Sequence, residues 1–428
     1  MISRCLTILA VLHLCPEALF AQASNDDARL RSLEDQLRLA QESLQGLSNT
    51  IDTLVVELAE LRAGGQRASA STTALASDQR SMSDASYAER ILVPDLGHDE
   101  RGEELTPRPE LFVQTRFHAN PIDEAADSDA AVRNFGLNRV ELRWAGRVSE
   151  RIGMGYEIQH HPAPDGAAEE LVNDAYVEYY ATDSVTVRAG QFVKPFGFDI
   201  QHSSGDRESP ERGVFAGYFF PGQRDRGLML AADLSDLSQF TKGMSIYAGA
   251  FNGNRFFDDN NSALNYNLRL RKVFDSVPMA LGVSLQRGTQ ILPTGVGGND
   301  DEDLFGVDIQ YVVGRLGIRA EYVRGNTPST LLGIDPEFAG GFFPGSKSSG
   351  STAFFNYNLT AQDDIYWRWD RFENDPVTQG NIRAFNIGYL RSLGLHSRIG
   401  IDYQRKSNVT FNDDELNNAL SVTWNVSY

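Results

Sequence analysis

The chain has 428 residues, a net charge of −19 and a pI near 4.8. It therefore lacks the basic surface that nucleic-acid binders need to offset phosphate repulsion, and we expect no nucleic-acid partner. Its 38 glycines, 15 tyrosines and 24 phenylalanines favour β structure. A chain of this charge that handles anions has to concentrate its positive charge locally.

The first 23 residues have the pattern of a cleaved secretory signal peptide. Arg4 precedes an apolar stretch from Cys5 to Cys15, and Ala21-Gln22-Ala23 forms a small-residue cleavage site. Both cysteines lie in this stretch, so the mature protein would contain no thiol, which suits an oxidising compartment. A lipid anchor on Cys15 is the alternative, but the preceding bulky Leu14 disfavours it.

A heptad repeat in residues 27–63 predicts an α-helical coiled coil. Apolar residues recur at alternating steps of three and four, and polar residues fill most other positions. The repeat comprises Leu30, Leu33, Leu37, Ala40, Leu44, Leu47, Ile51, Leu54, Leu58 and Leu61. Leucine at both core positions does not strongly favour a dimer, so we take a trimer as the hypothesis. A single amphipathic helix packed on another domain remains an alternative.

Residues 64–108 are expected to form a flexible linker. Gly64-Gly65 ends the heptads, and the following stretch is rich in alanine, serine and threonine without any period. An acidic segment continues to Glu104, and Pro107 and Pro109 mark the entry to the next domain.

Residues 109–428 predict an all-β domain, a 16-stranded antiparallel transmembrane β-barrel that follows the coiled coil. Apolar and polar residues alternate along each segment, as in Leu420, Val422 and Trp424 against Ser421 and Thr423. The sixteen expected strands are 110–118, 134–148, 153–161, 172–182, 184–193, 225–233, 243–252, 263–273, 278–288, 304–313, 315–325, 350–361, 364–373, 381–392, 396–406 and 416–428.

The connections between these strands alternate in length. Those after even-numbered strands are mostly tight turns, and those after odd-numbered strands are mostly long and polar. Outer-membrane barrels have short periplasmic turns and long outer loops, so both barrel ends and the coiled coil are placed in the periplasm. A soluble β-sandwich is the alternative, but it gives no reason for the alternating connection lengths.

The face of the strands opposite the apolar one carries a series of arginines that would line a water-filled lumen. Arginine keeps its charge at any working pH and matches phosphate and carboxylate groups, so small anionic solutes are the expected cargo. The lumen candidates are Arg116, Arg139, Arg143, Arg188, Arg269, Arg271, Arg319, Arg368 and Arg398. The alternative is an unselective lumen in which Glu141, Glu178, Asp308, Glu321, Asp370 and Asp402, on the same face, neutralise these arginines.

The connection after the fifth strand, residues 194–224, is among the longest and carries Lys194, Arg207, Arg212 and Arg224. Folded into the barrel, this segment would set the smallest radius, and its charges would dominate selectivity. A solvated surface loop is the alternative.

Two segments here resemble the phosphate-selective porin O and P family. One contains Gly190-Gln191-Phe192 and Pro195-Phe196-Gly197, and the other is Pro221-Gly222-Gln223-Arg224-Asp225-Arg226-Gly227-Leu228. The resemblance covers residues 109–428 and implies a trimeric sixteen-stranded barrel whose arginines and lysines bind phosphate. The motif matches place Arg188, Lys194, Arg224 and Arg226 in that pore. Because this chain has few lysines near the constriction and many acidic residues, the resemblance implies a porin before it implies phosphate selectivity.

Other polar clusters give weaker signals. The acidic runs Asn299–Asp303 and Asp258–Asn261 are interpreted as solvated outer loops, and His160-His161 as interfacial polarity, so no metal or other cofactor is expected. No motif indicates a catalytic set. Three functions therefore stay open: a passive porin in contact with outer-membrane lipid, a tether that joins the membrane to peptidoglycan through the coiled coil, and a barrel enzyme.

Overall fold

The computed structural model describes residues 108–119, 133–162, 168–220, 222–254, 261–274, 276–291, 299–326, 347–373, 381–394, 396–408 and 417–428. The signal peptide (1–23), the coiled coil (27–63) and the linker apart from its last residue lie outside these ranges and stay predictions. Among the described residues, no helix is long and apolar enough to cross a membrane.

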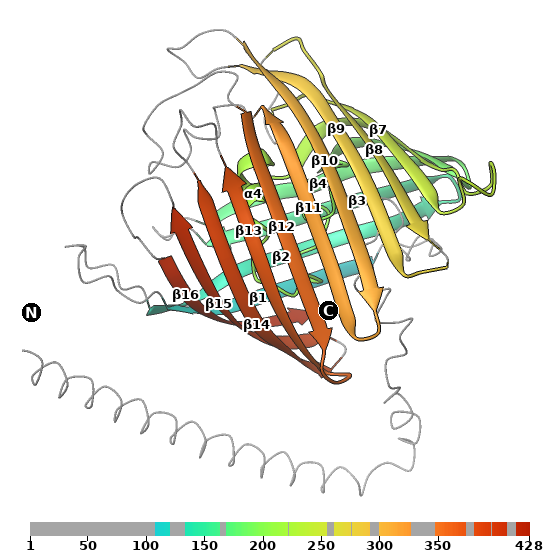
Figure 1. The fold of residues 1–428 in the computed structure, drawn as a ribbon. Helices are drawn as coiled ribbons and strands as arrows, with labels where there is room; N and C mark the ends of the chain where they lie inside the picture. The colour runs from blue at the N-terminus through green and yellow to red at the C-terminus, as the bar shows by residue number, and fades with distance from the viewer. Residues whose placement is uncertain are drawn as a thin grey trace, which may run out of the picture. The chain divides into compact units, whose positions relative to one another are not determined.

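The described chain forms a closed barrel of sixteen antiparallel strands, each paired with its neighbours in sequence, and β1 pairs with β16 (Figure 1). The expected barrel is therefore confirmed. The strands are β1 (Arg108–Ala119), β2 (Arg133–Ser149), β3 (Ile152–Pro162), β4 (Ala168–Thr182), β5 (Val185–Val193), β6 (Arg224–Asp233), β7 (Met244–Phe251), β8 (Asn265–Phe274), β9 (Met279–Ile291), β10 (Asn299–Val313), β11 (Leu316–Asn326), β12 (Lys347–Asn358), β13 (Asp363–Glu373), β14 (Ile382–Gly394), β15 (Ser397–Asn408) and β16 (Asn417–Ser427).

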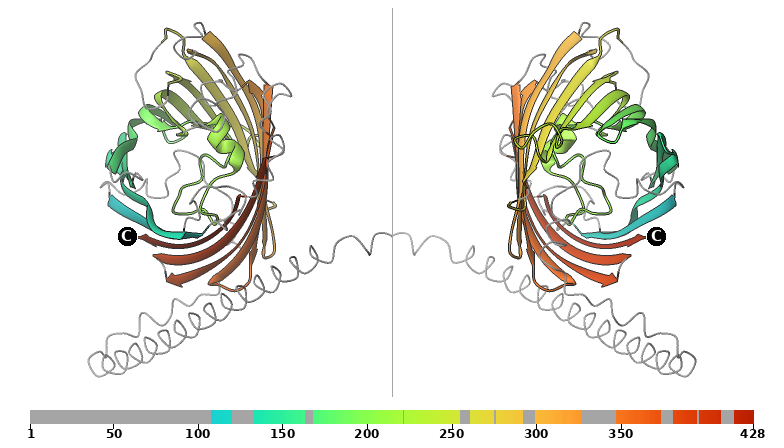
Figure 2. Two further views of the ribbon diagram at one scale, coloured as in Figure 1. Left: turned by 90° about the vertical axis from the view of Figure 1, so that its left-hand side faces the viewer. Right: turned by 90° about the vertical axis from the view of Figure 1, so that its right-hand side faces the viewer.

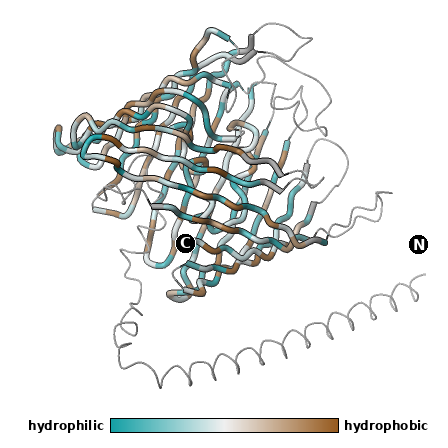
Figure 3. The backbone as a smooth tube through the Cα atoms, turned by 180° about the vertical axis from the view of Figure 1, so that it is seen from behind, coloured by the Kyte–Doolittle hydropathy of each residue, from teal (hydrophilic) through white to brown (hydrophobic). Residues whose placement is uncertain are grey.

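Alternating side chains give the wall its two faces. On β14, Phe385 and Ile387 are exposed on the outside, whereas Ala384 and Asn386 are buried on the inside. The same alternation appears as successive brown and teal segments along the strands in Figure 3. An apolar exterior and a polar interior suit lipid on one side and water on the other.

The two ends of the barrel differ in their connections. At one end, strands are joined by residues 150–151, 183–184, 314–315 and 395–396, and the ten-residue connection 234–243 is the longer exception. At the other end, the connections include residues 120–132, 194–223 and 327–346. The start of β1 meets the end of β16 at the short-turn end, which in outer-membrane barrels generally is the periplasmic one.

One prediction about a loop is wrong. The acidic run Asn299–Asp303 is not an outer loop but the first part of β10, where Asp301 pairs in register with Thr289 of β9. Alternation continues through it, because Glu302 is buried inside and Asp303 is exposed outside. The second acidic run, 258–261, lies outside the described residues except for Asn261.

The connection from β5 to β6 turns into the barrel. We call residues 194–220 and 222–223 the inner segment; it contains the short helix α4 (Val214–Phe219). In both views of Figure 2, α4 and the chain around it lie within the ring of strands. A helix at this place was not predicted from the sequence.

Candidate functional site

An apolar cluster holds the inner segment against one side of the wall. Phe196, Ile200, Phe215, Phe219 and Phe220 are almost fully buried. They pack on the inward-facing Leu304, Val323, Phe372 and Ile382 of β10, β11, β13 and β14. Apolar residues on the water-facing side of a barrel are unusual, and these four are the sequence signal that could have predicted the contact.

Two glycines make this close approach possible. A Cβ on Gly350 of β12 would lie 2.4 Å from the Cβ of Phe215, and a Cβ on Gly197 would lie 1.8 Å from Oε1 of Glu321. Gly197 also has a φ of +53°, which side chains other than glycine rarely adopt. Glu321 accepts hydrogen bonds from the backbone N–H groups of Phe198 and Asp199, both at 2.9 Å, and fixes the turn that follows.

Buried polar contacts hold the segment on the same side. Arg319 of β11 forms an ion pair with Glu208 at 2.5 Å, with the two side chains only 2% and 5% exposed. Asn356 of β12 donates to the other oxygen of Glu208 at 3.3 Å. An ion pair with so little solvent around it costs several kcal/mol to break by removing one partner, so this contact fixes the segment firmly.

Two further wall arginines donate hydrogen bonds to the segment, mostly to its backbone. Arg368 of β13 donates to Oγ of Ser209 and to the carbonyl of Glu211, both at 2.6 Å, while pairing with Asp370 at 2.8 Å. Arg398 of β15 donates to the carbonyl oxygens of Gly205 and Arg207 at 2.7 Å each. The predicted lumen arginines Arg319, Arg368 and Arg398 therefore do face inward, and they anchor the segment.

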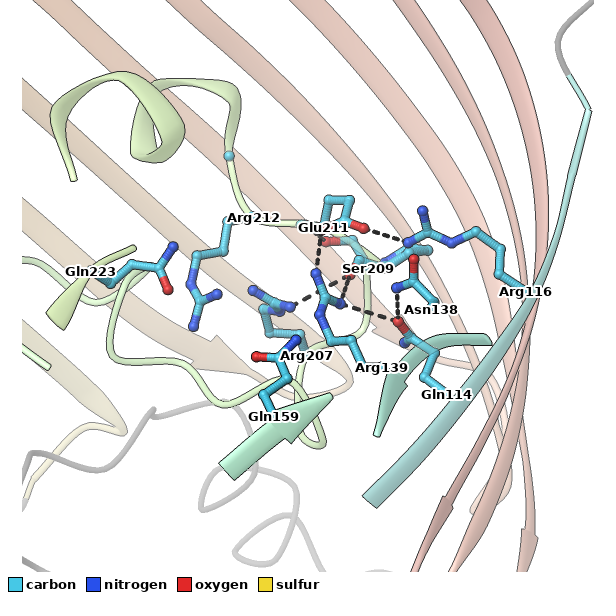
Figure 4. Close-up of polar contacts among 12 residues, drawn as sticks. Gln114, Arg116, Asn138, Arg139, Gln159, Arg207, Ser209, Glu211, Arg212 and Gln223 are labelled. Atoms are coloured by element: carbon cyan, nitrogen blue, oxygen red, sulfur yellow. Dashed lines mark hydrogen bonds and ion pairs between the residues drawn. The ribbon is translucent and has the colours of Figure 1, made fainter. Parts of the chain in front are cut away.

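A second part of the wall, β1 and β2, faces Glu211 of the inner segment through arginines, as Figure 4 shows. Arg116 and Arg139 donate to the two oxygens of Glu211 at 2.5 and 2.6 Å. Arg139 also donates to Gln114 at 3.1 Å and to the carbonyl of Pro210 at 3.0 Å. The Glu211 side chain is 47% exposed, so this pair is open to solvent.

Arg207 and Arg212 complete what we call the arginine cluster, defined as Arg116, Arg139, Arg207 and Arg212. Arg212 is held by the carbonyls of Asp199 and His202 at 3.1 and 2.9 Å. Arg207 is only 4% exposed; its Nη2 lies 3.5 Å from the carbonyl of Pro210, and its Nε and Nη1 have no hydrogen-bond partner among the described residues. Burial and the neighbouring Arg212 and Arg139 lower the pKa of Arg207. The acids around this guanidinium therefore do not fully compensate its positive charge.

Neutral amides and few acids surround this cluster. Gln114, Gln159 and Gln223 lie beside it in Figure 4. Besides Glu211, the nearby acids are Glu141 on β2 and Asp199, which accepts a hydrogen bond from the backbone N–H of Gly213. Guanidinium and amide N–H groups that converge in this way can bind a carboxylate or a phosphate.

Other predicted lumen arginines are matched by acids of the wall. Arg143 and Arg224 share Glu157 at 2.5 and 3.0 Å, and Arg224 also contacts Asp174. Arg188 pairs with Glu178, and Arg269 with Asp308, each at 2.6 Å. In these parts of the wall, acids on the inner face therefore neutralise the arginines, as in the alternative of an unselective lumen.

Three predicted residues lie away from the cluster. Arg271 faces inward on β8 and is 7% exposed. Lys194 begins the inner segment, where its ammonium group lies 5.7 Å from the centre of the Phe220 ring. Arg226 shares its face of β6 with the exposed Leu228 and Leu230 and donates to Gln191, so it lies on the outer face of the wall.

Within the described ranges, no group of three or more His, Cys, Asp or Glu residues is arranged to hold a metal ion.

Comparisons with known proteins agree with this architecture. Residues 113–293 match the model of the family "Phosphate-selective porin O and P", which confirms the resemblance seen in the motifs. A search of curated protein sequences found no match. The similar solved structures include the outer membrane channel DcaP of Acinetobacter baumannii, with 11% identity and a TM-score of 0.55 over 75% of this chain and 97% of that chain.

Two other solved structures have a similar fold. The anion-selective porin from Comamonas acidovorans has 10% identity and a TM-score of 0.52 over 76% of this chain and 99% of that chain. The trimer form of OmpT, an outer membrane protein of Vibrio cholerae, has 13% identity and a TM-score of 0.50 over 76% of this chain and 99% of that chain. At such identities the likeness concerns the fold alone.

Proposed function

We propose, from the family match over residues 113–293, that this chain is an outer-membrane porin through which small solutes diffuse, with a preference for anions. The closed barrel with an apolar exterior supports the membrane location, and the polar interior supports a water-filled path. The family and the porin folds among the similar structures favour a channel over an enzyme.

The inner segment is the proposed constriction of this channel. It leaves the wall at the end of β5, packs on β10, β11, β13 and β14, and returns to the start of β6, so it extends into the interior of the barrel. We place the solute path on the side of the segment that carries the arginine cluster, because the Glu211 side chain there is open to solvent. Charges at the narrowest point of a pore have the largest effect on which ions pass.

The anion preference rests on Arg207. The wall arginines are largely matched by carboxylates, but two nitrogens of the Arg207 guanidinium lack a partner among the described residues. An anion that enters the cluster would supply the missing acceptor. A few donors in a water-filled site bind such an anion weakly enough to release it again.

The test is the reversal potential of the purified protein in a planar bilayer under a potassium chloride gradient. We expect the wild type to shift toward the chloride potential and Arg207→Gln to lose much of that shift. Arg315→Gln, in the turn between β10 and β11, removes the same charge outside the constriction and should change little. A cation-selective wild type would overturn the anion preference, and a protein that does not conduct would overturn the porin.

Phosphate is the proposed class of preferred anion, supported by the family description. Added to the bilayer chambers, inorganic phosphate should reduce the chloride current of the wild type more than that of Arg207→Gln. Equal reduction of both currents would leave a general anion pore without a phosphate site.

A homotrimer is the proposed assembly. The predicted heptads of residues 27–63 support it, as does the trimer form recorded for the similar Vibrio cholerae barrel. On the outer face near the long-loop end of β1 and β2, Phe117, Phe135 and Leu137 form an apolar surface suited to contact another copy. Native mass spectrometry in detergent should give the mass of three chains, and a monomer mass would contradict this assembly.

A further inference from the structure

Basic side chains recur on the outer face of the barrel at its long-loop end. They lie within the five residues of their strands that are nearest this end. Their side chains point away from the lumen, because the residues next to them in sequence, such as Gln286, Val323 and Phe372, are buried on the inner face. We call this set the outer rim: Arg287 of β9, Arg324 of β11, Arg371 of β13, Arg383 of β14 and Arg405 of β15.

Each rim arginine lies directly beside a large apolar side chain on the same face. Two residues further toward the middle of each strand stand Leu285, Tyr322, Trp369, Phe385 and Tyr403, all exposed on the outside. These side chains have the position and chemistry of the belt that contacts lipid chains. The rim arginines therefore lie at the outer boundary of that belt, at the level of lipid headgroups.

Among the described residues, the outer rim has more basic than acidic side chains. Arg287 lies 3.6 Å from Asp303 and is 86% exposed, and Arg371 pairs with Glu373. Asp301 is a further exposed acid on this face, and Lys347 adds a cation at the start of β12. Among the described residues, no carboxylate forms an ion pair with Arg324, Arg383 or Arg405.

Two of these arginines face each other across neighbouring strands. Arg371 and Arg383 are direct partners in the β13–β14 register. Like charges directly opposite each other destabilise a sheet, so an anion in addition to Glu373, which pairs with Arg371, would stabilise this arrangement. At the opposite end of β14, the outward Arg391 is matched by Asp363 at 3.0 Å.

We propose that the outer rim binds the phosphate groups of the acylated glycolipid in the outer leaflet, whose chains cover the apolar belt below. Guanidinium groups match phosphate oxygens in pairs, and surface arginines contribute to binding of anionic lipid headgroups. The long-loop end is the outer one, so the rim is at the leaflet that carries phosphorylated glycolipid. This surface is separate from the lumen and does not depend on the proposed anion preference.

The test uses the full-length protein, purified in detergent and stripped of lipid, with purified bis-phosphorylated lipid A as the probe. Native mass spectrometry measures the bound lipid. We expect Arg371→Gln/Arg383→Gln to weaken binding about tenfold. Arg315→Gln/Arg391→Gln removes two arginines at the short-turn end and should bind as the wild type does. Wild-type binding of chemically dephosphorylated lipid A should be weakened to a similar degree.

Several outcomes would overturn the proposal. These are equal binding by the rim variant and the wild type, equal binding of the two lipids, or release of the lipid by an equimolar amount of inorganic phosphate. Folding of each variant is checked by the heat-dependent shift of the barrel on a denaturing gel. If the first variant does not fold, Arg324→Gln/Arg405→Gln tests the same surface on other strands, with the same expected tenfold loss.

Discussion

The two sides of the inner segment use the same kind of ion pair in different surroundings. Towards β11, Glu208 and Arg319 pair at 2.5 Å with side chains 5% and 2% exposed. Towards β1, Glu211 and Arg116 pair at the same distance, but they are 47% and 16% exposed. A buried charge that loses its partner costs far more than an exposed one. The first pair therefore fixes where the segment lies, and the second adjusts the charge beside the proposed solute path.

The largest effect is expected from Glu208→Ala on the buried side. It leaves Arg319 without a carboxylate and Asn356 without one acceptor, at a cost of about 3–5 kcal/mol to the docked state of the segment. Trypsin cleavage after Arg207 or Arg212, followed by mass spectrometry, should become at least about a hundredfold faster. An unchanged cleavage rate would show that the buried pair does not hold the segment.

A smaller effect is expected from Phe215→Leu in the apolar cluster. The side chain is fully buried against the wall, and the loss of ring volume should cost about 1–2 kcal/mol. The same cleavage assay should show a rise of roughly tenfold. Phe385→Leu makes the same change on the outer face of β14 and should leave the cleavage rate unaltered. If both variants behave alike, the packing argument fails.

The smallest effect on stability is expected from Glu211→Gln on the open side. Because the pair is exposed, the docked state of the segment should lose less than about 1 kcal/mol of stability. The arginine cluster then keeps its four cations with one acid fewer, so the reversal potential should move further toward chloride. A shift toward potassium, or trypsin cleavage as fast as in Glu208→Ala, would break the distinction between the two sides.

The barrel could be predicted from the sequence because its signals are local. Period-two alternation and the lengths of the connections depend only on neighbouring residues, and they also placed Arg188, Arg269 and Arg319 on the inner face. Arg226 was assigned from a motif match, against the alternation of its strand, and it lies on the outer face.

The partners of the arginines could not be predicted in the same way. Arg269 and Asp308 are 39 residues apart, and Arg319 and Glu208 are 111 apart. Such pairs depend on the register of distant strands and on the path of the inner segment. The helix α4 was missed because six residues carry too little periodicity, although the apolar Leu304, Val323, Phe372 and Ile382 on the inner face mark its docking surface.

The seam between β1 and β16 has a consequence for how the barrel is assembled. All other neighbouring strands are consecutive in the chain, but Gln114 and Asn425, which are hydrogen-bonded at this seam, are separated by 311 residues. Hairpins can form early from nearby segments, whereas contacts over such a distance form slowly. Until β16 arrives, β1 exposes a row of unpaired backbone groups that can recruit a strand from another molecule. Loss of β16 would therefore leave an open sheet with unpaired edge strands, which would aggregate and would not close into a smaller pore.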